Sequence, residues 1–300
     1  VRVYYLESND LTSSWTQLGQ DIIGEADGDE FGYSVSLSDD GKTLAVGADG
    51  NDGNGLNSSC VRIYHLEDDG TSSWEQIGQD IYGEPKYYYF GSSVSLSADG
   101  TTVVIGVPWN SGNGEYSGQV RVYQIDSAGS TWEQLGQDIN GDVVGDQFGI
   151  SVDISSDGKT LAIGAPGYWE ENDRPGYVRV YYLESNDLTS SWTQLGQDII
   201  GEADGDDFGR SVSLSDDGKT LAVGAFTNDG NGENSGHVRV YRMDDSSTSW
   251  TQVGEDINGE AEYDSSGYAV SLSADGTTVA IGATGNDDNG LGQVRIFSVK

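Results

Sequence analysis

The chain has 300 residues and a formal net charge of -36, because 50 acidic residues stand against only 14 basic ones. Such a surface repels nucleic acid and anionic membranes, so we expect neither nucleic-acid binding nor membrane insertion. No apolar run approaches the roughly 20 residues that a spanning helix needs. The single cysteine, Cys60, excludes a disulfide framework and leaves a solitary thiol or an inter-chain disulfide as alternatives.

One order of segments recurs along the whole chain. The first unit contains strand-like segments at residues 1–6, 15–22, 31–38 and 44–48, with an Asp-Gly turn at 40–41. In residues 31–38 serine alternates with larger residues, a period of two that predicts a strand, and Asp-Gly between two such segments indicates a hairpin. No segment shows the spacing of an amphipathic helix, so we predict an all-β protein.

The repeat period is 56 to 60 residues, and the units begin at about residues 1, 61, 120, 178 and 238. Four short strands in each such unit are typical of a β-propeller. We number these strands one (Phe-Gly), two (Ala-Val-Gly-Ala or its equivalent), three (Val-Arg-Val-Tyr) and four (Trp-x-Gln). The sequence predicts one domain over residues 1–300, a five-bladed propeller of four-stranded antiparallel blades.

Strand three occurs six times and each other strand five times, so one copy of strand three is left over when five blades are assembled. The last blade would take its fourth strand from residues 15–22, and N- and C-terminal strands would close the ring. Either residues 1–6 or the final strand, 294–300, is then surplus. An unpaired strand lies as an extra edge, or it pairs with a neighbouring chain. The second case predicts head-to-tail self-association into filaments.

Two distant stretches are almost identical. Residues 1–48 and 178–225 differ only at Glu30 against Asp207 and at Tyr33 against Arg210. The offset equals three units, which indicates that the array grew by copying blocks of three.

The loops between strands two and three are rich in Asn, Asp and Gly. Their side-chain oxygens are candidate ligands for Ca²⁺, the one cofactor the sequence suggests. The same residue types also form turns without any ion. The candidate ligands are Asp52, Asn54, Asp229, Asn231, Asp287 and Asn289.

Three aromatic residues, Trp109, Tyr168 and Trp169, lie outside the repeated framework. They are candidates for stacking on sugars, or they cover a neighbouring loop. Asn57 begins the only Asn-x-Ser/Thr glycosylation pattern.

Arginine recurs in strand three, and aspartate recurs in strand four beside it. We expect a structural ion pair in each blade. The structural arginines are Arg62, Arg121, Arg179, Arg239 and Arg295, with a sixth copy at Arg2. Acidic loops at residues 25–29, 202–206 and 260–264 lie between strands four and one and are either solvated or cation-binding.

The pairing of Phe-Gly with Val-Gly-Ala, followed by Val-Arg-Val-Tyr, resembles the FG-GAP repeats of integrin α-chain propellers. It is most similar to long surface proteins of marine microbes. The resemblance implies an extracellular or cell-surface location and partners among extracellular proteins or glycans. The calcium loop of the integrin type is not inherited here, because residues 38–42 are too few to wrap a cation.

Acidic side chains that recur in nearly every unit suggest a scaffold and not an asymmetric catalytic centre. We therefore expect a non-catalytic structural or adhesive module, with a Ca²⁺-dependent, lectin-like propeller as the alternative.

Overall fold

The protein is described by a computed structural model over residues 1–6, 13–55, 58–67, 72–84, 89–167, 174–185, 187–244, 248–285 and 292–299. Every regular element in these ranges is a β-strand. Within the same ranges there is no helix of the length and apolarity needed to cross a membrane. The prediction of an all-β protein is confirmed.

Four antiparallel sheets have five strands each. In the first sheet β3 (Phe31–Leu37), β4 (Thr43–Ala48), β5 (Cys60–Leu66) and β6 (Trp74–Gln76) lie in order, and β7 (Ile81–Tyr82) also pairs with β5. The second sheet contains β8 (Ser93–Leu96), β9 (Thr102–Val107), β10 (Gln119–Ile125), β11 (Trp132–Gln134) and β12 (Ile139–Asn140).

The third and fourth sheets repeat this order. The third contains β13 (Ser151–Ile154), β14 (Thr160–Ala165), β15 (Tyr177–Tyr182), β16 (Thr193–Gln194) and β17 (Ile199–Ile200). The fourth contains β18 (Ser211–Leu214), β19 (Thr220–Ala225), β20 (His237–Arg242), β21 (Thr251–Gln252) and β22 (Ile257–Asn258).

The two ends of the chain carry smaller sheets. The fifth sheet has three described strands, β23 (Ser266–Leu272), β24 (Thr278–Ala283) and β25 (Gln293–Ser298). The N-terminal hairpin has two, β1 (Tyr4–Leu6) and β2 (Trp15–Gln17), which are a third and a fourth strand of the repeat.

The segment expected to form one fourth strand is split in two. In the first sheet β6 and β7 both pair with β5, and Gly78 between them has a φ of 71°. Left-handed backbone of this kind favours glycine and interrupts a strand. The sequence pattern missed this break because the Trp-to-Ile segment reads as continuous.

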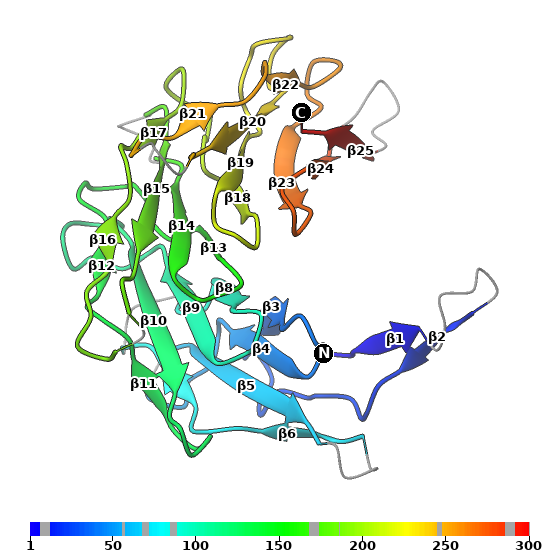
Figure 1. The fold of residues 1–300 in the computed structure, drawn as a ribbon, viewed down its shortest axis with the longest axis vertical. Helices are drawn as coiled ribbons and strands as arrows, with labels where there is room; N and C mark the ends of the chain where they lie inside the picture. The colour runs from blue at the N-terminus through cyan, green and yellow to red at the C-terminus, as the bar shows by residue number, and fades with distance from the viewer. Residues whose placement is uncertain are drawn as a thin grey trace.

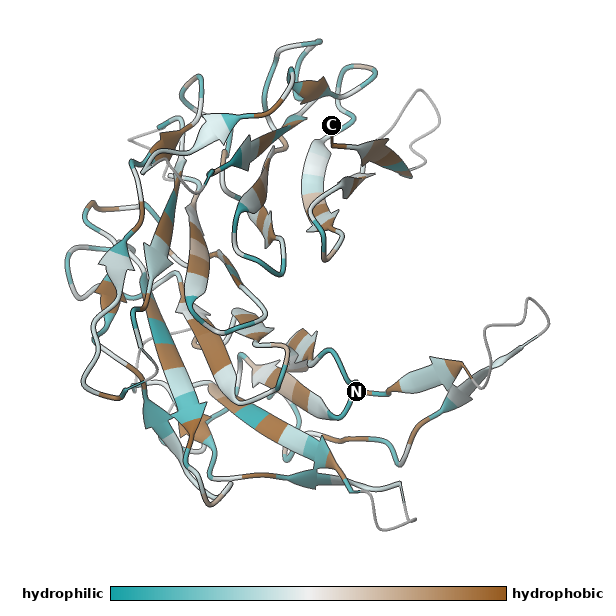
Figure 2. Ribbon diagram, viewed as in Figure 1, coloured by the Kyte–Doolittle hydropathy of each residue, from teal (hydrophilic) through white to brown (hydrophobic). Residues whose placement is uncertain are grey.

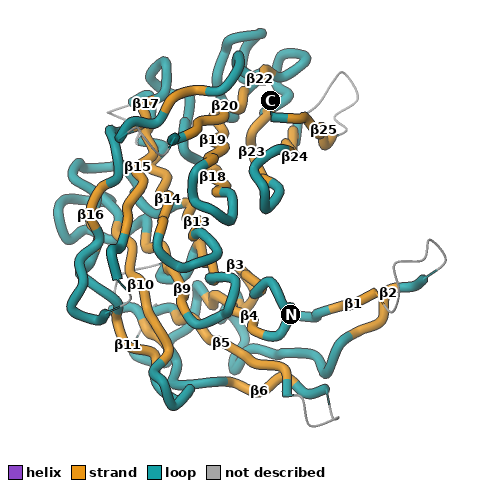
Figure 3. Tube along the Cα trace, in the orientation of Figure 1, coloured by secondary structure: helices purple, strands orange, loops and turns teal. Residues whose placement is uncertain are grey.

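The sheets follow one another around an arc, with the Phe-Gly strand of each sheet toward the inside (Figure 1). Strand β8 contacts β3 and β13, and β18 contacts β13 and β23. The N-terminal hairpin lies apart from the fifth sheet (Figures 1 and 3). Strand β2 pairs with β1, and β25 pairs with β24, so closure of the ring by these strands is not confirmed.

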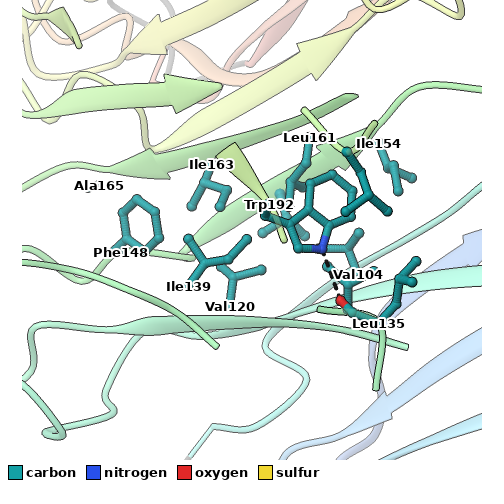
Figure 4. Packing of buried hydrophobic residues seen from close by; sticks show 13 residues of the cluster. Val104, Val120, Leu135, Ile139, Phe148, Ile154, Leu161, Ile163, Ala165 and Trp192 are labelled. Carbon is teal, nitrogen blue, oxygen red and sulfur yellow. Dashed lines mark hydrogen bonds between the residues drawn. The ribbon is translucent and has the colours of Figure 1, made fainter. Parts of the chain in front are cut away.

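The core lies between neighbouring sheets, and apolar bands run along the inner strands (Figure 2). Between the second and third sheets Trp192 packs near Leu161 and Ile154, and its indole nitrogen donates a hydrogen bond to the Leu135 carbonyl at 3.0 Å (Figure 4). Trp74, Trp132 and Trp250 donate to the preceding unit in the same way. Each of these four tryptophans therefore links its own unit to the one before.

Candidate functional site

A pocket of about 550 Å³ opens where the first four sheets converge. This size is within the range of small-molecule sites. We call it the central pocket. Its lining comes from three positions of the repeat: the residue before Phe-Gly, the residue after Phe-Gly, and the first residues after the second strand.

The residue after Phe-Gly differs among the first four units. Tyr33, Ser92, Ile150 and Arg210 occupy this position in the first four sheets, and all four line the central pocket. The fifth sheet has Tyr268 there. The centre of the arc is therefore asymmetric, although the framework around it repeats.

The residue before Phe-Gly is held by backbone geometry. Asp207 has a φ of 54°, and its carbonyl accepts a hydrogen bond from the Arg210 backbone N–H at 3.0 Å. Gln147 and Tyr89 have the same left-handed backbone in their sheets. This turn places the side chains before and after Phe-Gly on one pocket wall, so Asp207 and Arg210 both line it.

Aromatic rings form two further parts of the site. Trp109 lies between Tyr89, with ring centroids 5.5 Å apart, and Tyr116, with centroids 5.1 Å apart. In the fourth sheet, the Arg210 guanidinium carbon lies 5.8 Å from the centroid of the Tyr268 ring. The site thus offers aromatic faces, a five-donor guanidinium and a carboxylate.

Burial shifts the pKa values of two groups near this wall. Burial, and then the charge of Asp49, raises the pKa of Tyr33. Burial and the neighbouring Glu30 raise the pKa of Asp49 to about 7. Asp49 follows β4 at the position that Pro166 and Phe226 hold in the pocket lining. Perturbed carboxyl groups of this kind are enriched at functional sites.

The two near-identical stretches differ only at these pocket positions. Asp207 and Arg210 line the central pocket, as does Tyr33, and Glu30 holds the place of Asp207 in the first sheet. The differences were visible in the sequence, but only the fold shows that both positions face one pocket. Gln147 and Phe226 had no sequence signal beyond their variation between units.

In the loops expected to bind Ca²⁺, polar side chains form hydrogen bonds with other groups of the protein. The Asn54 amide donates to the Gly83 carbonyl, and Asn231 donates to the Gly259 carbonyl at 2.7 Å. The Asp229 carboxylate accepts from the backbone N–H of Asn234. These contacts fit the turn-forming alternative. Asp287 and Asn289 lie outside the described residues, and Asp52 makes an interaction of its own.

Of the predicted sugar-stacking residues, Trp109 lines the central pocket. Tyr168 and Trp169 lie outside the described residues, as does the glycosylation candidate Asn57. Cys60 is a free, buried thiol.

Four of the six recurrent arginines lie between two carboxylates in the described part of the chain. Arg62 contacts Asp80 of its own sheet at 2.8 Å and Glu25 of the preceding linker at 2.6 Å. The same triad recurs as Glu84–Arg121–Asp138, Asp142–Arg179–Asp198 and Glu202–Arg239–Asp256. The strand-four aspartate was expected. The linker carboxylate was missed, because the sequence shows it only as part of an acidic loop.

Repeated antiparallel sheets with a Phe-Gly strand inside define a β-propeller-type protein. A model of the FG-GAP repeat matches residues 24–64 and 201–241. The chain thus contains two segments that match the FG-GAP repeat, and this match agrees with the resemblance found in the sequence.

Solved structures share the fold at low sequence identity. The Pseudomonas aeruginosa periplasmic gluconolactonase is 18% identical with a TM-score of 0.60, over 100% of this chain and 79% of that one. A putative 6-phosphogluconolactonase from Bacteroides uniformis is 14% identical with a TM-score of 0.57, over 99% and 78%. The Kuenenia stuttgartiensis hydrazine synthase is 16% identical with a TM-score of 0.52, over 89% and 71%.

These comparisons contradict the expectation of a non-catalytic structural, adhesive or lectin-like module, since two of the three structures are lactonases by name. The expectation failed because it weighed only carboxylates that recur in every unit. The central pocket is built from positions that differ between units, and such positions can form an asymmetric catalytic centre.

Proposed function

We propose that the central pocket binds a sugar lactone or the corresponding hydroxy acid, and that the protein hydrolyses the lactone. The observation that carries this proposal is the pair of near-identical stretches. Across residues 1–48 and 178–225 the chain differs only at two positions, and three of the four side chains there, Tyr33, Asp207 and Arg210, line the central pocket. Divergence confined to a pocket supports a ligand-binding role for it.

The chemistry of the wall suits a polar ring with a carbonyl group. The Trp109 face stacks on the C–H face of a sugar ring, and Arg210 donates hydrogen bonds to the carbonyl oxygen. In the hydrolysis, Asp207 accepts a proton from water while the water oxygen bonds to the carbonyl carbon. The ring C–O bond then breaks, and the proton passes to the departing ring oxygen, so one water converts the lactone into a hydroxy acid.

The test uses glucono-δ-lactone as substrate and gluconate as the binding probe. We expect the wild-type chain to open the lactone faster than the spontaneous rate in a pH-stat, and to bind gluconate in calorimetry. The double variant Asp207→Glu/Arg210→Tyr makes this stretch identical to residues 1–48, whose fold already accommodates those residues. It should lose at least tenfold in rate and keep its melting temperature.

Lys219→Thr is the matched control. Lys219 is an exposed turn residue of the same sheet, other units carry threonine there, and the change also removes one positive charge. It should leave rate and binding unchanged. The proposed hydrolysis is overturned if the wild-type chain does not accelerate lactone opening. The proposed binding site is overturned if the wild-type chain does not bind gluconate.

We also propose that the five sheets form a closed five-bladed ring around the pocket, with β2 seated on β25. The contact that recurs between neighbouring sheets has two sides, and each end of the chain presents one of them without its partner. Trp15 is 69% exposed, whereas Trp192 is 3% exposed against the preceding sheet. A Cβ on Gly136 would lie 2.8 Å from Trp192, but one on Gly254 would meet nothing within 4 Å. Gly254 is therefore the open counterpart of Trp15.

The ion pairs support the same closure. Arg295 contacts Glu260 at 3.7 Å but lacks the strand-four aspartate of the other triads in the described part of the fifth sheet. Arg2 pairs with Asp21 but with no linker carboxylate among the described residues. If β25 takes the place of β1 on β2, Asp21 passes from Arg2 to Arg295 and completes the fifth triad.

An extracellular location is part of this proposal. It rests on the resemblance to secreted FG-GAP proteins and on the strongly acidic composition.

A further inference from the structure

His237, at the start of β20, is a fully buried histidine without a hydrogen-bond partner. It is 1% exposed, and neither ring nitrogen has a partner among the described residues. Buried polar groups are nearly always hydrogen-bonded, so an unpartnered imidazole in a native fold requires an explanation. It lies on the third strand and outside the lining of the central pocket.

Two carboxylates lie beside this imidazole. A ring nitrogen of His237 and one oxygen each of Glu202 and Asp256 all lie within 4.8 Å of one another. The three residues come from different segments: His237 from β20, Glu202 from the linker after β17, and Asp256 from the residue before β22. The fold therefore converges three ligand-type side chains on one point.

The same position in other sheets carries side chains that are satisfied. The Gln119 amide donates to Asn140 at 2.8 Å and to Asp138 at 3.2 Å. The Tyr177 hydroxyl donates to Asp146 at 2.9 Å. Position and surroundings are thus shared, and His237 differs in that neither ring nitrogen has a hydrogen-bond partner among the described residues. An imidazole nitrogen beside two carboxylates is suited to binding a cation.

Arg239 shares these carboxylates but does not exhaust them. Asp256 accepts two hydrogen bonds from Arg239 and one from Gln252, and Glu202 pairs with Arg239 through one oxygen. An ionised carboxylate has about four lone-pair positions. One therefore remains on Asp256 and three on Glu202, each available to a metal ion while the arginine stays in place.

We propose that His237, Glu202 and Asp256 bind one divalent transition-metal ion of the zinc class. Imidazole with carboxylate oxygens suits Zn²⁺, Co²⁺ and Ni²⁺, whereas Ca²⁺ and Mg²⁺ prefer oxygen ligands alone. Ligand atoms of a tetrahedral zinc site lie about 3.4 Å apart, so the exposed Glu202 side chain moves inward when the ion binds. Burial and the neighbouring Arg239 lower the pKa of His237, which keeps the imidazole in the neutral form that binds metal.

The experiment measures metal binding to the whole chain and is independent of lactone hydrolysis. Calorimetry with Zn²⁺ should give one site of micromolar or tighter affinity, and Co²⁺ should give visible absorption bands of a four-coordinate site. His237→Gln places the residue found at 119 and 293 in this position, so the fold accommodates it. It should weaken Zn²⁺ binding at least tenfold and abolish the Co²⁺ bands.

His65→Gln is the matched control, because it removes the other histidine of the chain and should leave both signals unchanged. Glu202→Gln changes an exposed side chain and should weaken Zn²⁺ binding while the melting temperature without metal is kept. The proposal is overturned if the wild-type chain binds no Zn²⁺, or if His237→Gln and wild type bind it equally.

Discussion

Asp49 shows how one residue departs from the repeat at a cost in stability. The equivalent positions carry proline, phenylalanine or threonine, whereas Asp49 is a buried carboxyl with one oxygen that has no partner among the described residues. Burial of such a group favours its protonated form. The charge of Asp49 raises the pKa of Tyr33, which lines the central pocket.

We predict that Asp49 makes the protein less stable as pH rises. Its pKa of about 7 in the folded state exceeds the unfolded value of about 3.9. The contribution of Asp49 to the free energy of unfolding is therefore fully present below about pH 4. As pH rises to about 7 this contribution is lost, and the free energy of unfolding falls by about 2 to 4 kcal/mol. Urea unfolding of wild type and Asp49→Asn at pH 5 and pH 8 tests this.

The variant should be the more stable protein at pH 8, and its stability should change less between the two pH values. Equal pH dependence in both proteins would show that Asp49 ionises freely in the fold. Asp40→Asn is the control, because the pKa of Asp40 is lowered by hydrogen bonds from the Lys42 backbone and Ser38. That variant should be less stable than wild type at pH 8.

At the scale of elements, the link between sheets is a tryptophan of one unit and a glutamine of the unit before. Gln137 accepts a hydrogen bond from the Trp192 backbone N–H and donates one to its carbonyl. The indole fills the space beside Gly136. This set recurs at Trp74, Trp132 and Trp250, so sheets stack at a fixed spacing.

We predict that Trp192→Ala lowers the free energy of unfolding by about 3 to 5 kcal/mol, because it leaves a large cavity between two sheets. Trp192→Phe retains an aromatic ring, so it should lower the free energy of unfolding by less than the alanine variant does. Urea denaturation monitored by circular dichroism measures both changes. A loss below about 1 kcal/mol for the alanine variant would mean that the sheets do not depend on this contact.

The whole molecule is an arc whose two ends are complementary. Ile296 on β25 is 72% exposed, whereas its equivalent Ile63 is buried within the first sheet. The pairing of β5 with β6 sets the register for closure. His65 lies opposite Glu75 there, and the equivalent residues at the two ends are Ser298 and Thr16.

We predict that Thr16→Cys/Ser298→Cys forms an intramolecular disulfide in a Cys60→Ser background. The oxidised product should run as a faster monomer on a non-reducing gel and melt at a higher temperature, since the bond closes a very long loop. Each single cysteine variant is a control and should show neither change. Disulfide-linked dimers, or free thiols after oxidation, would contradict closure within one chain.

The sequence by itself determined the all-β class, the order of strands, the hairpin turns and the arginine–aspartate pairs. These follow from local patterns: a period of two, Asp-Gly turns, and charges that recur in each unit. It could not determine the break at Gly78, which depends on backbone conformation, or the linker carboxylates, which reach the arginine of the following sheet.

Only the tertiary structure decided where the irregular residues meet. Tyr33, Arg210 and Trp109 are far apart in the chain, and they share a pocket because each Phe-Gly strand lies on the inside of the arc. His237 meets Glu202 and Asp256 for a similar reason, since the linker folds back on the following sheet. A repeating sequence specifies the framework locally, whereas a site arises from the angle between sheets, which brings non-repeating positions together.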